Sequence, residues 1–149
     1  MPPPWPDIWP PLRMRPIKQR PSPLYKGSIM TDYLSPEEVV QAQLDAFNAR
    51  DINAWLATYA MDARQFLWPG QLVATGHAQI KERAETRFQE ADLHAYLIKR
   101  AVMGDLVIDS EKVTRLFPDG PGYIELTCIY EVKAGKIQAA SFIFGRRID

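Results

Sequence analysis

Cysteine, histidine and long apolar runs are scarce in this sequence of 149 residues, and each scarcity excludes a class of protein. A single cysteine, Cys128, cannot form an internal disulfide, which excludes a disulfide-stapled fold and indicates a reducing cytoplasm. The two histidines, His77 and His94, belong to no metal-binding motif, so we expect no metal ion. No apolar run approaches the roughly 18 residues of a membrane span, so we expect no membrane partner.

The distribution of charge argues against a nucleic-acid partner. The 18 basic and 18 acidic residues cancel over the whole chain. Residues 1–29, however, contain five of the basic residues and one of the acidic residues, which leaves 13 basic and 17 acidic residues in the rest. Proteins that bind nucleic acids present a basic patch, whereas residues 30–149 carry a net negative charge.

Proline is concentrated at the N-terminus, where residues 1–29 hold nine of the 13 prolines. Such a segment cannot sustain regular hydrogen-bonded structure, so we expect an extended or disordered arm there. Met30 opens a stretch that reads like an ordinary protein start. Residues 1–29 could therefore lie upstream of the working protein, dock on it, or act as a targeting segment. Residues 30–149 are expected to form a single domain, since they suffice for one core.

Three helices are predicted in the first half of this domain. Ser35 and Glu38 form a capping-box pattern that predicts a helix over residues 36–50. Asp51 is expected to cap a second helix, and a third is predicted over residues 77–91. The apolar stripe of the second helix comprises Ile52, Trp55, Leu56 and Tyr59.

Six β-prone segments follow or interrupt the helices, separated by turn residues. The predicted order is α-α-β-β-α-β-β-β-β, which favours the α+β class, with helices packed on one face of a curved antiparallel sheet. The strands are expected at residues 64–68, 71–75, 93–103 and 106–117, and in the two arms of a hairpin within residues 123–144, which turns at residues 133–136.

The hairpin of residues 123–144 is the most informative segment. Alternation places Ile137 on the opposite face of the second arm from its aromatic residues, so that arm is apolar on both sides. We interpret the hairpin as the floor of a cavity that the helices cover. The residues expected to share one face of each arm are Leu126, Cys128, Tyr130 and Val132, and then Ala140, Phe142 and Phe144.

Charged residues fall on one face of the strand at residues 106–117. Asp109, Glu111 and Arg115 share this face by parity. They could form a ladder that faces solvent, or a carboxylate–arginine pair at the mouth of a pocket. Apolar neighbours on the same face support the pocket, because burying charges is costly. These neighbours are Val107, Val113 and Phe117.

His94 and Cys128 each have two possible roles. His94 shares a strand face with Tyr96 and Ile98, and it could be a hydrogen-bonded structural residue or an acid–base group that acts near neutral pH. Cys128 is interpreted as a small buried apolar residue rather than a nucleophile, because no basic neighbour or helix terminus is evident that would lower its pKa.

The run DINAWLATYAMDARQFLWPG, residues 51–70, resembles the signature of the nuclear transport factor 2-like superfamily. That group includes ketosteroid isomerases, SnoaL-like polyketide cyclases, scytalone dehydratase and limonene epoxide hydrolase. The resemblance covers residues 35–145 and implies a cystatin-like α+β barrel. In that fold a cone-shaped curved sheet wraps around the three helices, leaves a pocket at its wide end, and commonly dimerises through its outer face.

The catalytic residues that this resemblance would imply are mostly missing. The isomerase base would fall at Leu67 or Trp68, and its two hydrogen-bond donors would fall at Gln43 and near Cys128. None of these can do that chemistry, so we do not expect the steroid isomerase reaction. The dehydratase would need two pocket histidines, of which only His94 is a candidate.

An epoxide hydrolase of this superfamily uses aspartate, arginine and aspartate, and the nearest match is Asp109, Glu111 and Arg115. We therefore expect Glu111 or Asp109 as the acid–base group, Arg115 as a clamp for an anion or carbonyl, and His94 as a helper. The reaction would be a cofactor-free isomerisation, dehydration, cyclisation or hydrolysis of a small hydrophobic ligand. A non-catalytic binding or assembly module is the alternative. The expected cavity residues are Trp55, Tyr59, Trp68, Cys128, Tyr130, Phe142 and Phe144.

Overall fold

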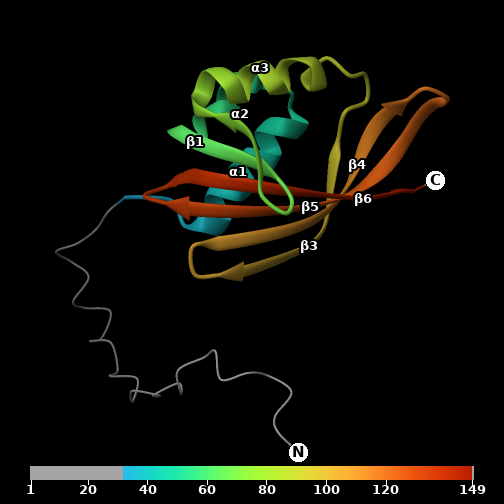
Figure 1. Ribbon diagram of the computed structural model, residues 1–149. Helices are drawn as coiled ribbons and strands as arrows, with labels where there is room; N and C mark the ends of the chain where they lie inside the picture. Colours follow the sequence, from blue (N-terminus) through green and yellow to red (C-terminus); the bar gives the residue numbers. More distant parts are fainter. Residues whose placement is uncertain (1–31, 149) are drawn as a thin grey trace, which may run out of the picture. The chain divides into compact units, whose positions relative to one another are not determined.

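The computed structural model describes residues 32–148 (Figure 1). The predicted arm of residues 1–29 lies outside the described residues, and the elements below belong to the unit that begins at Tyr33. The elements are α1 (Pro36–Asn48), α2 (Ile52–Ala57), β1 (Tyr59–Leu67), β2 (Gln71–Thr75), α3 (Gly76–Phe88), β3 (Ala95–Met103), β4 (Leu106–Phe117), β5 (Gly120–Lys133) and β6 (Lys136–Ile148).

The predicted order of elements and the α+β class are confirmed. Figure 1 shows the three helices gathered on one side of a curved sheet. Within the described residues the sheet has six strands in the order β2-β1-β6-β5-β4-β3. The expectation of an antiparallel sheet is correct for every neighbouring pair except β1 and β6, which run parallel. Strand alternation predicts which face is buried but does not predict which distant strand lies alongside.

The first two helices begin at their predicted caps. The Ser35 side chain accepts a hydrogen bond from the Glu38 backbone N–H, and the Glu38 carboxylate accepts one from the Ser35 backbone N–H. The Asp51 side chain accepts a hydrogen bond from the Ala54 backbone N–H. Each cap satisfies a backbone donor that the first helical turn leaves without a partner.

Tyr59 belongs to β1 and not to α2, which corrects the sequence prediction. The α2 helix ends at Ala57, and the Thr58 carbonyl then accepts a hydrogen bond from the Ile137 backbone N–H. Tyr59 pairs with Ile137 in the parallel ladder. Pairing with a strand far along the chain thus outweighs the helical spacing of Tyr59 and starts β1 five residues earlier than predicted.

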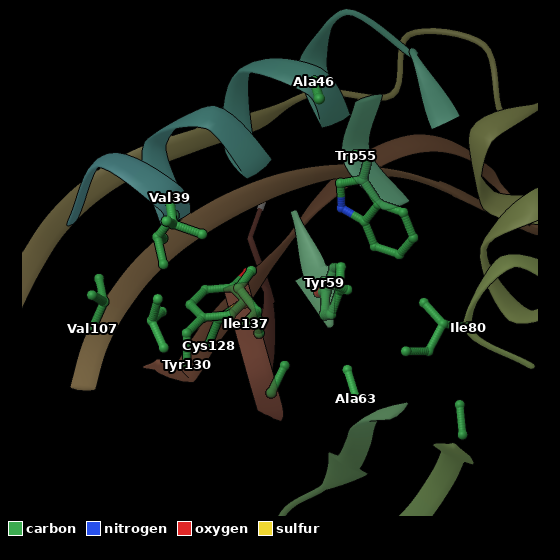
Figure 2. Close-up of a cluster of buried hydrophobic side chains, with 14 residues drawn as sticks. Val39, Ala46, Trp55, Tyr59, Ala63, Ile80, Val107, Cys128, Tyr130 and Ile137 are labelled. Carbon is green, nitrogen blue, oxygen red and sulfur yellow. The ribbon is translucent and has the colours of Figure 1, made fainter. Parts of the chain in front are cut away.

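The final hairpin turns where predicted, but its second arm is shifted. Ala134 and Gly135 both have positive φ, as a two-residue hairpin turn requires. The β5–β6 register then slips, so that Val132 pairs with Ile137 whereas Glu131 pairs with Ala139. Ile137 therefore joins the buried core (Figure 2), and the prediction that it lies on the opposite face is wrong. A bulge of one residue reverses the faces of a strand on its two sides.

Parity in β4 is confirmed and positions the polar residues of the interior. Val107, Asp109, Glu111 and Val113 are all buried, whereas the intervening residues are only half-buried. Two carboxyl groups therefore lie on the inner face of the sheet. No helix in the described part of the chain is long and apolar enough to cross a membrane.

Candidate functional site

A cavity of about 120 Å³ lies between the helices and the inner face of the sheet. Its volume is close to the roughly 150 Å³ that holds benzene in an engineered protein cavity, so its interior suits about one ring. All three helices contribute Gln43, Leu44, Phe47, Trp55, Arg83, Ala84, Arg87 and Phe88 to its wall. The strands contribute Tyr59, Gln65, Ala95, Glu111, Val113, Arg115, Ile124, Leu126, Cys128, Tyr130, Phe142 and Phe144.

The exposure of the lining residues distinguishes a deep end from a mouth. Tyr59, Cys128 and Tyr130 are at most 2% exposed, so they mark the deep end. Arg83 and Phe144 are exposed lining residues, so they mark the mouth.

Glu111 is the carboxyl group in the cavity wall. It is 5% exposed and takes part in no ion pair among the described residues. The Sγ atom of Cys128 lies 4.0 Å from its Oε2 atom, which is at most a weak hydrogen bond. Burial, together with the negative charge of Asp109, raises the pKa of Glu111 from 4.5 to about 8, although Arg100 opposes this shift. Glu111 is therefore mainly protonated at neutral pH and can donate a proton.

Asp109 lies on the same inner face of β4 as Glu111 but does not line the cavity. It is fully buried and binds Arg100 of β3 through two bonds, from Nε to Oδ1 at 2.7 Å and from Nη2 to Oδ2 at 2.9 Å. The Nη1 atom of Arg100 donates to the side-chain oxygen of Gln41 at 2.8 Å. Both carboxylate oxygens of Asp109 are thus engaged, so Glu111 fits the predicted acid–base role better than Asp109 does. The charge of Asp109 instead acts on Glu111.

Arg115 lines the cavity but does not bind Glu111. Its Nε atom lies 3.4 Å from Oε2 of Glu90, just beyond the end of α3. Four residues along a strand separate Glu111 from Arg115 by about 13 Å. The carboxylate–arginine pair considered from the sequence is therefore absent from the described residues, although both residues line the same cavity.

Aromatic side chains form much of the wall and bring two hydrogen-bond donors without partners. The rings of Trp55 and Tyr59 are 5.0 Å apart (Figure 2), and Phe88 lies 5.4 Å from Trp55. Trp55 Nε1 and Tyr59 Oη are buried and have no hydrogen-bond partner among the described residues, although Gln65 lies near the Tyr59 hydroxyl. Burial raises the pKa of Tyr59, so its hydroxyl stays protonated. Buried donors without partners are costly unless a ligand engages them.

Besides Asp109, two of the expected site residues lie outside the cavity. Trp68 is 59% exposed at the end of β1, next to the Pro69 turn. His94 precedes the buried Ala95, so alternation directs His94 to the outer face, where its ring lies 4.4 Å from the ring of Tyr96 at a tilted angle. The interpretation of His94 as a structural residue therefore fits its position better than a catalytic role.

The remaining expected lining residues contribute to the cavity wall. Cys128, Tyr130, Phe142 and Phe144 line it together with Trp55 and Tyr59. Burial, together with the charge of Glu111, raises the pKa of Cys128 well above its ordinary value. This thiol therefore stays protonated, in agreement with the interpretation of Cys128 as a small buried residue rather than a nucleophile.

Sequence reasoning missed several polar residues of the wall and also the partner of Asp109, although signals for them were present. Arg83 and Arg87 lie three and seven residues after the buried Ile80, so helical spacing puts them beside its face. The Gly104 turn pairs Met103 with Leu106, and counting back along both strands would have paired Arg100 with Asp109. Gln43 lies three residues after the buried Val40, and Gln65 alternates with the buried Ala63, so the same kinds of spacing indicated them as well.

No group of three histidine, cysteine, aspartate or glutamate side chains that could hold a metal ion is found within residues 32–148. The polar groups of the cavity are instead hydroxyl, indole, amide and guanidinium groups and a single carboxyl group. This arrangement can bind an organic molecule and move a proton.

Residues 40–140 match the SnoaL-like domain family. No curated protein sequence matches the chain. Among solved structures, an uncharacterised cystatin-fold protein from Novosphingobium aromaticivorans is 24% identical, with a TM-score of 0.65 over 74% of this chain and 98% of that one. A candidate polyketide cyclase from Sinorhizobium meliloti is 26% identical, with a TM-score of 0.60 over 70% of this chain and 92% of that one. An LEH-like epoxide hydrolase from M. tuberculosis is 14% identical, with a TM-score of 0.64 over 74% and 82%.

Proposed function

The chain belongs to the SnoaL-like domain family, and on this premise we propose that its cavity binds a small, mainly apolar molecule and that Glu111 exchanges a proton with it. One observation carries the proposal. Glu111 is a buried carboxyl group on the cavity wall, without an ion-pair partner among the described residues, and its pKa is raised to about 8. A group that titrates near neutral pH is well matched to donating and accepting protons.

The neighbouring donors suit a ligand that carries an oxygen substituent. Trp55 Nε1 and Tyr59 Oη are buried in the wall and lack partners in the described part of the chain. A carbonyl or hydroxyl oxygen of the ligand would accept from them. When a proton is removed from the carbon next to a ligand carbonyl, negative charge develops on the carbonyl oxygen, and such donors stabilise that charge. The aromatic rings around them would hold the carbon skeleton.

This arrangement favours reactions that need one acid–base group. Isomerisation, dehydration and cyclisation can proceed by proton transfer through Glu111 without a cofactor. Hydrolysis by two carboxylates and an arginine fits this site less well, because Asp109 is bound to Arg100 and does not line the cavity. Proteins of similar structure include both an epoxide hydrolase and a candidate cyclase, and a shared fold does not select between such reactions.

The test begins with a panel of terpenoid, steroid and aromatic polyketide compounds, scored by thermal shift and then by mass-spectrometric turnover. We expect at least one compound to stabilise the protein and to be converted. The Glu111→Gln variant should bind that compound and lose turnover by at least about 100-fold, since positioned proton transfer contributes 10²–10⁴-fold. The matched control is Glu131→Gln, which removes a partly exposed carboxyl group that pairs with Lys133.

A non-catalytic binding module is the second candidate. It is favoured by the absence of any hydrogen bond between Glu111 and Arg115 in the described residues and by the position of His94 outside the cavity. Binding without conversion of any compound would support this candidate. Undiminished turnover by Glu111→Gln would exclude Glu111 as the proton-transfer group, and the absence of any stabilising compound would reject the cavity as a ligand site. Dimerisation through the outer face of the sheet stays a prediction, which sedimentation equilibrium would check.

A further inference from the structure

Three arginines border the mouth of the cavity, and we call Arg83, Arg87 and Arg115 the arginine cluster. Arg83 and Arg87 are one helical turn apart on α3, so their side chains leave the same face of the helix. Arg115 extends toward them from β4, since both Arg87 and Arg115 approach Glu90. The guanidinium of Arg83 lies over the ring of Phe142, 5.7 Å from its centroid. Cationic and aromatic groups therefore meet at the entrance.

The positive charge of the arginine cluster is only partly compensated. Within residues 32–148, Glu90 is the one carboxylate at ion-pair distance, and two arginines share it. Its contacts are 3.7 Å to Nε of Arg87 and 3.4 Å to Nε of Arg115, both longer than a good charged hydrogen bond. Glu111 adds no compensation while it is protonated. Three guanidinium charges thus meet a single carboxylate.

The terminal nitrogens of two of these arginines are available to a ligand. Among the described residues, Nη1 of Arg83 donates to the side-chain oxygen of Gln65 at 3.2 Å, whereas the Nη atoms of Arg87 and Arg115 make no hydrogen bond. The Nε atom of Arg115 is buried and also makes no hydrogen bond of good geometry. Burial and the charge of Arg115 lower the pKa of Arg87, although Glu90 opposes this shift. An anion bound here would accept hydrogen bonds from the unpaired guanidinium nitrogens and would compensate the positive charge of the arginine cluster.

We propose that the arginine cluster binds the anionic oxygen group of the ligand, so that the natural ligand is an apolar ring acid with a carboxylate or phosphate monoester at the mouth. This inference deepens the proposed function, because it takes the cavity to be the ligand site. The forked donors of arginine match the oxygens of both groups. The ring enters the aromatic cavity, while Glu111 lies at the deep end, about 13 Å along β4 from Arg115. The anion thereby fixes which end of the ligand meets Glu111.

Three small probes separate the anion from the ring: phenylacetate, its neutral amide phenylacetamide, and phenyl phosphate. Each is titrated into the ¹⁵N-labelled full chain at pH 7, and the indole N–H resonance of Trp55 reports occupancy of the cavity. We expect phenylacetate or phenyl phosphate to bind at least about tenfold more tightly than phenylacetamide, because hydrogen bonds to charged groups are the stronger ones. The tighter of the two anions identifies the group. Raising the salt concentration should weaken only the anionic probes.

Variants localise the effect to the arginine cluster. Arg87→Gln and Arg115→Gln should each weaken the preferred anion by about 10- to 100-fold and leave phenylacetamide unchanged. The matched control is Arg64→Gln, which removes an exposed arginine that lies over Phe66 on β1 and outside the cavity. Urea unfolding of each variant verifies that it is folded.

The outcomes distinguish this inference from the proposed function. Equal binding of the acid and the amide, with no effect of Arg87→Gln, would overturn the anion site and leave the cavity as a site for neutral ligands. A failure of all three probes to shift the Trp55 indole resonance would count against the cavity itself, and both proposals would fall.

Discussion

Replacing Glu111 with glutamine removes a carboxyl group whose pKa is raised from 4.5 to about 8 by burial and by the charge of Asp109. The folded protein therefore holds this proton more tightly than the unfolded chain does. Between these two pKa values the folded state binds more protons, so the free energy of unfolding falls as pH rises. The contribution of Glu111 is complete below pH 4.5 and is lost as pH rises through about 8.

The size of this effect follows from the pKa difference. One pKa unit corresponds to about 1.4 kcal/mol, so Glu111 should cost the wild-type protein about 4 kcal/mol of stability between pH 5 and pH 8. Glutamine has a similar shape and does not titrate. The Glu111→Gln variant should therefore gain stability relative to wild type over the same range by about that amount. All other titrating groups are common to both proteins, so the difference isolates Glu111.

Urea unfolding at pH 5, 6, 7 and 8, followed by circular dichroism, measures this difference, and equal m-values establish that the two transitions can be compared. The Glu131→Gln variant serves as the control and should run parallel to wild type, because Glu131 lies near the surface and pairs with Lys133. Parallel pH curves for wild type and Glu111→Gln would refute the reasoning. They would mean that Glu111 is ionised in the folded protein, and its assignment as a proton donor at neutral pH would fail with it.

Three further substitutions test the placement of individual side chains. Arg100→Ala leaves the charge of Asp109 buried without its partner, so the free energy of unfolding measured in urea should fall by about 3–5 kcal/mol. The control Lys133→Ala breaks a surface ion pair and should lower it by less than about 1 kcal/mol. Equal losses in the two variants would contradict a buried ion pair. Tyr59→Phe removes a buried hydroxyl that has no hydrogen-bond partner, so the variant should be at least as stable as wild type in urea unfolding. Its affinity for a ligand that carries an oxygen substituent should fall. A destabilised variant would imply that the hydroxyl does make a hydrogen bond in the folded protein. Trp68→Ala should change the free energy of unfolding by no more than about 0.5 kcal/mol, because Trp68 is exposed and lies outside the cavity. Ligands should still raise the melting temperature of this variant as they do for wild type. Loss of that ligand-induced rise would place Trp68 in the site.

Local sequence patterns predicted the helices and strands well wherever residues that are close in sequence decide the local structure. The capping box at Ser35 and Glu38 begins α1, and the turn at Ala134 and Gly135 closes the last hairpin. Both depend on hydrogen bonds or backbone angles within a few residues. Parity in β4 also held, because a regular strand alternates its faces without interruption.

The prediction failed where a distant segment intervened. Tyr59 belongs to a strand rather than to the predicted helix because it pairs with Ile137 in the sheet. Ile137 lies on the other face from the one predicted because the β5–β6 register slips beside it. His94 was considered for the site because histidine can act as an acid–base group near neutral pH, yet the buried Ala95 shows that the inner face begins one residue later. A shift of one residue suffices for the errors at Ile137 and His94, since the side-chain period of a strand is two.

The sequence by itself determined the class of fold, the order of its elements, and the presence of Glu111 and Asp109 on one face of a strand. It could not assign different roles to those two carboxyl groups. Only the tertiary structure did so, because Arg100 from β3 engages Asp109, while Glu111 is left in an apolar wall that raises its pKa. The physical reason is that a pKa depends on burial and on charges from other strands and helices, and these are set by packing rather than by position along the chain.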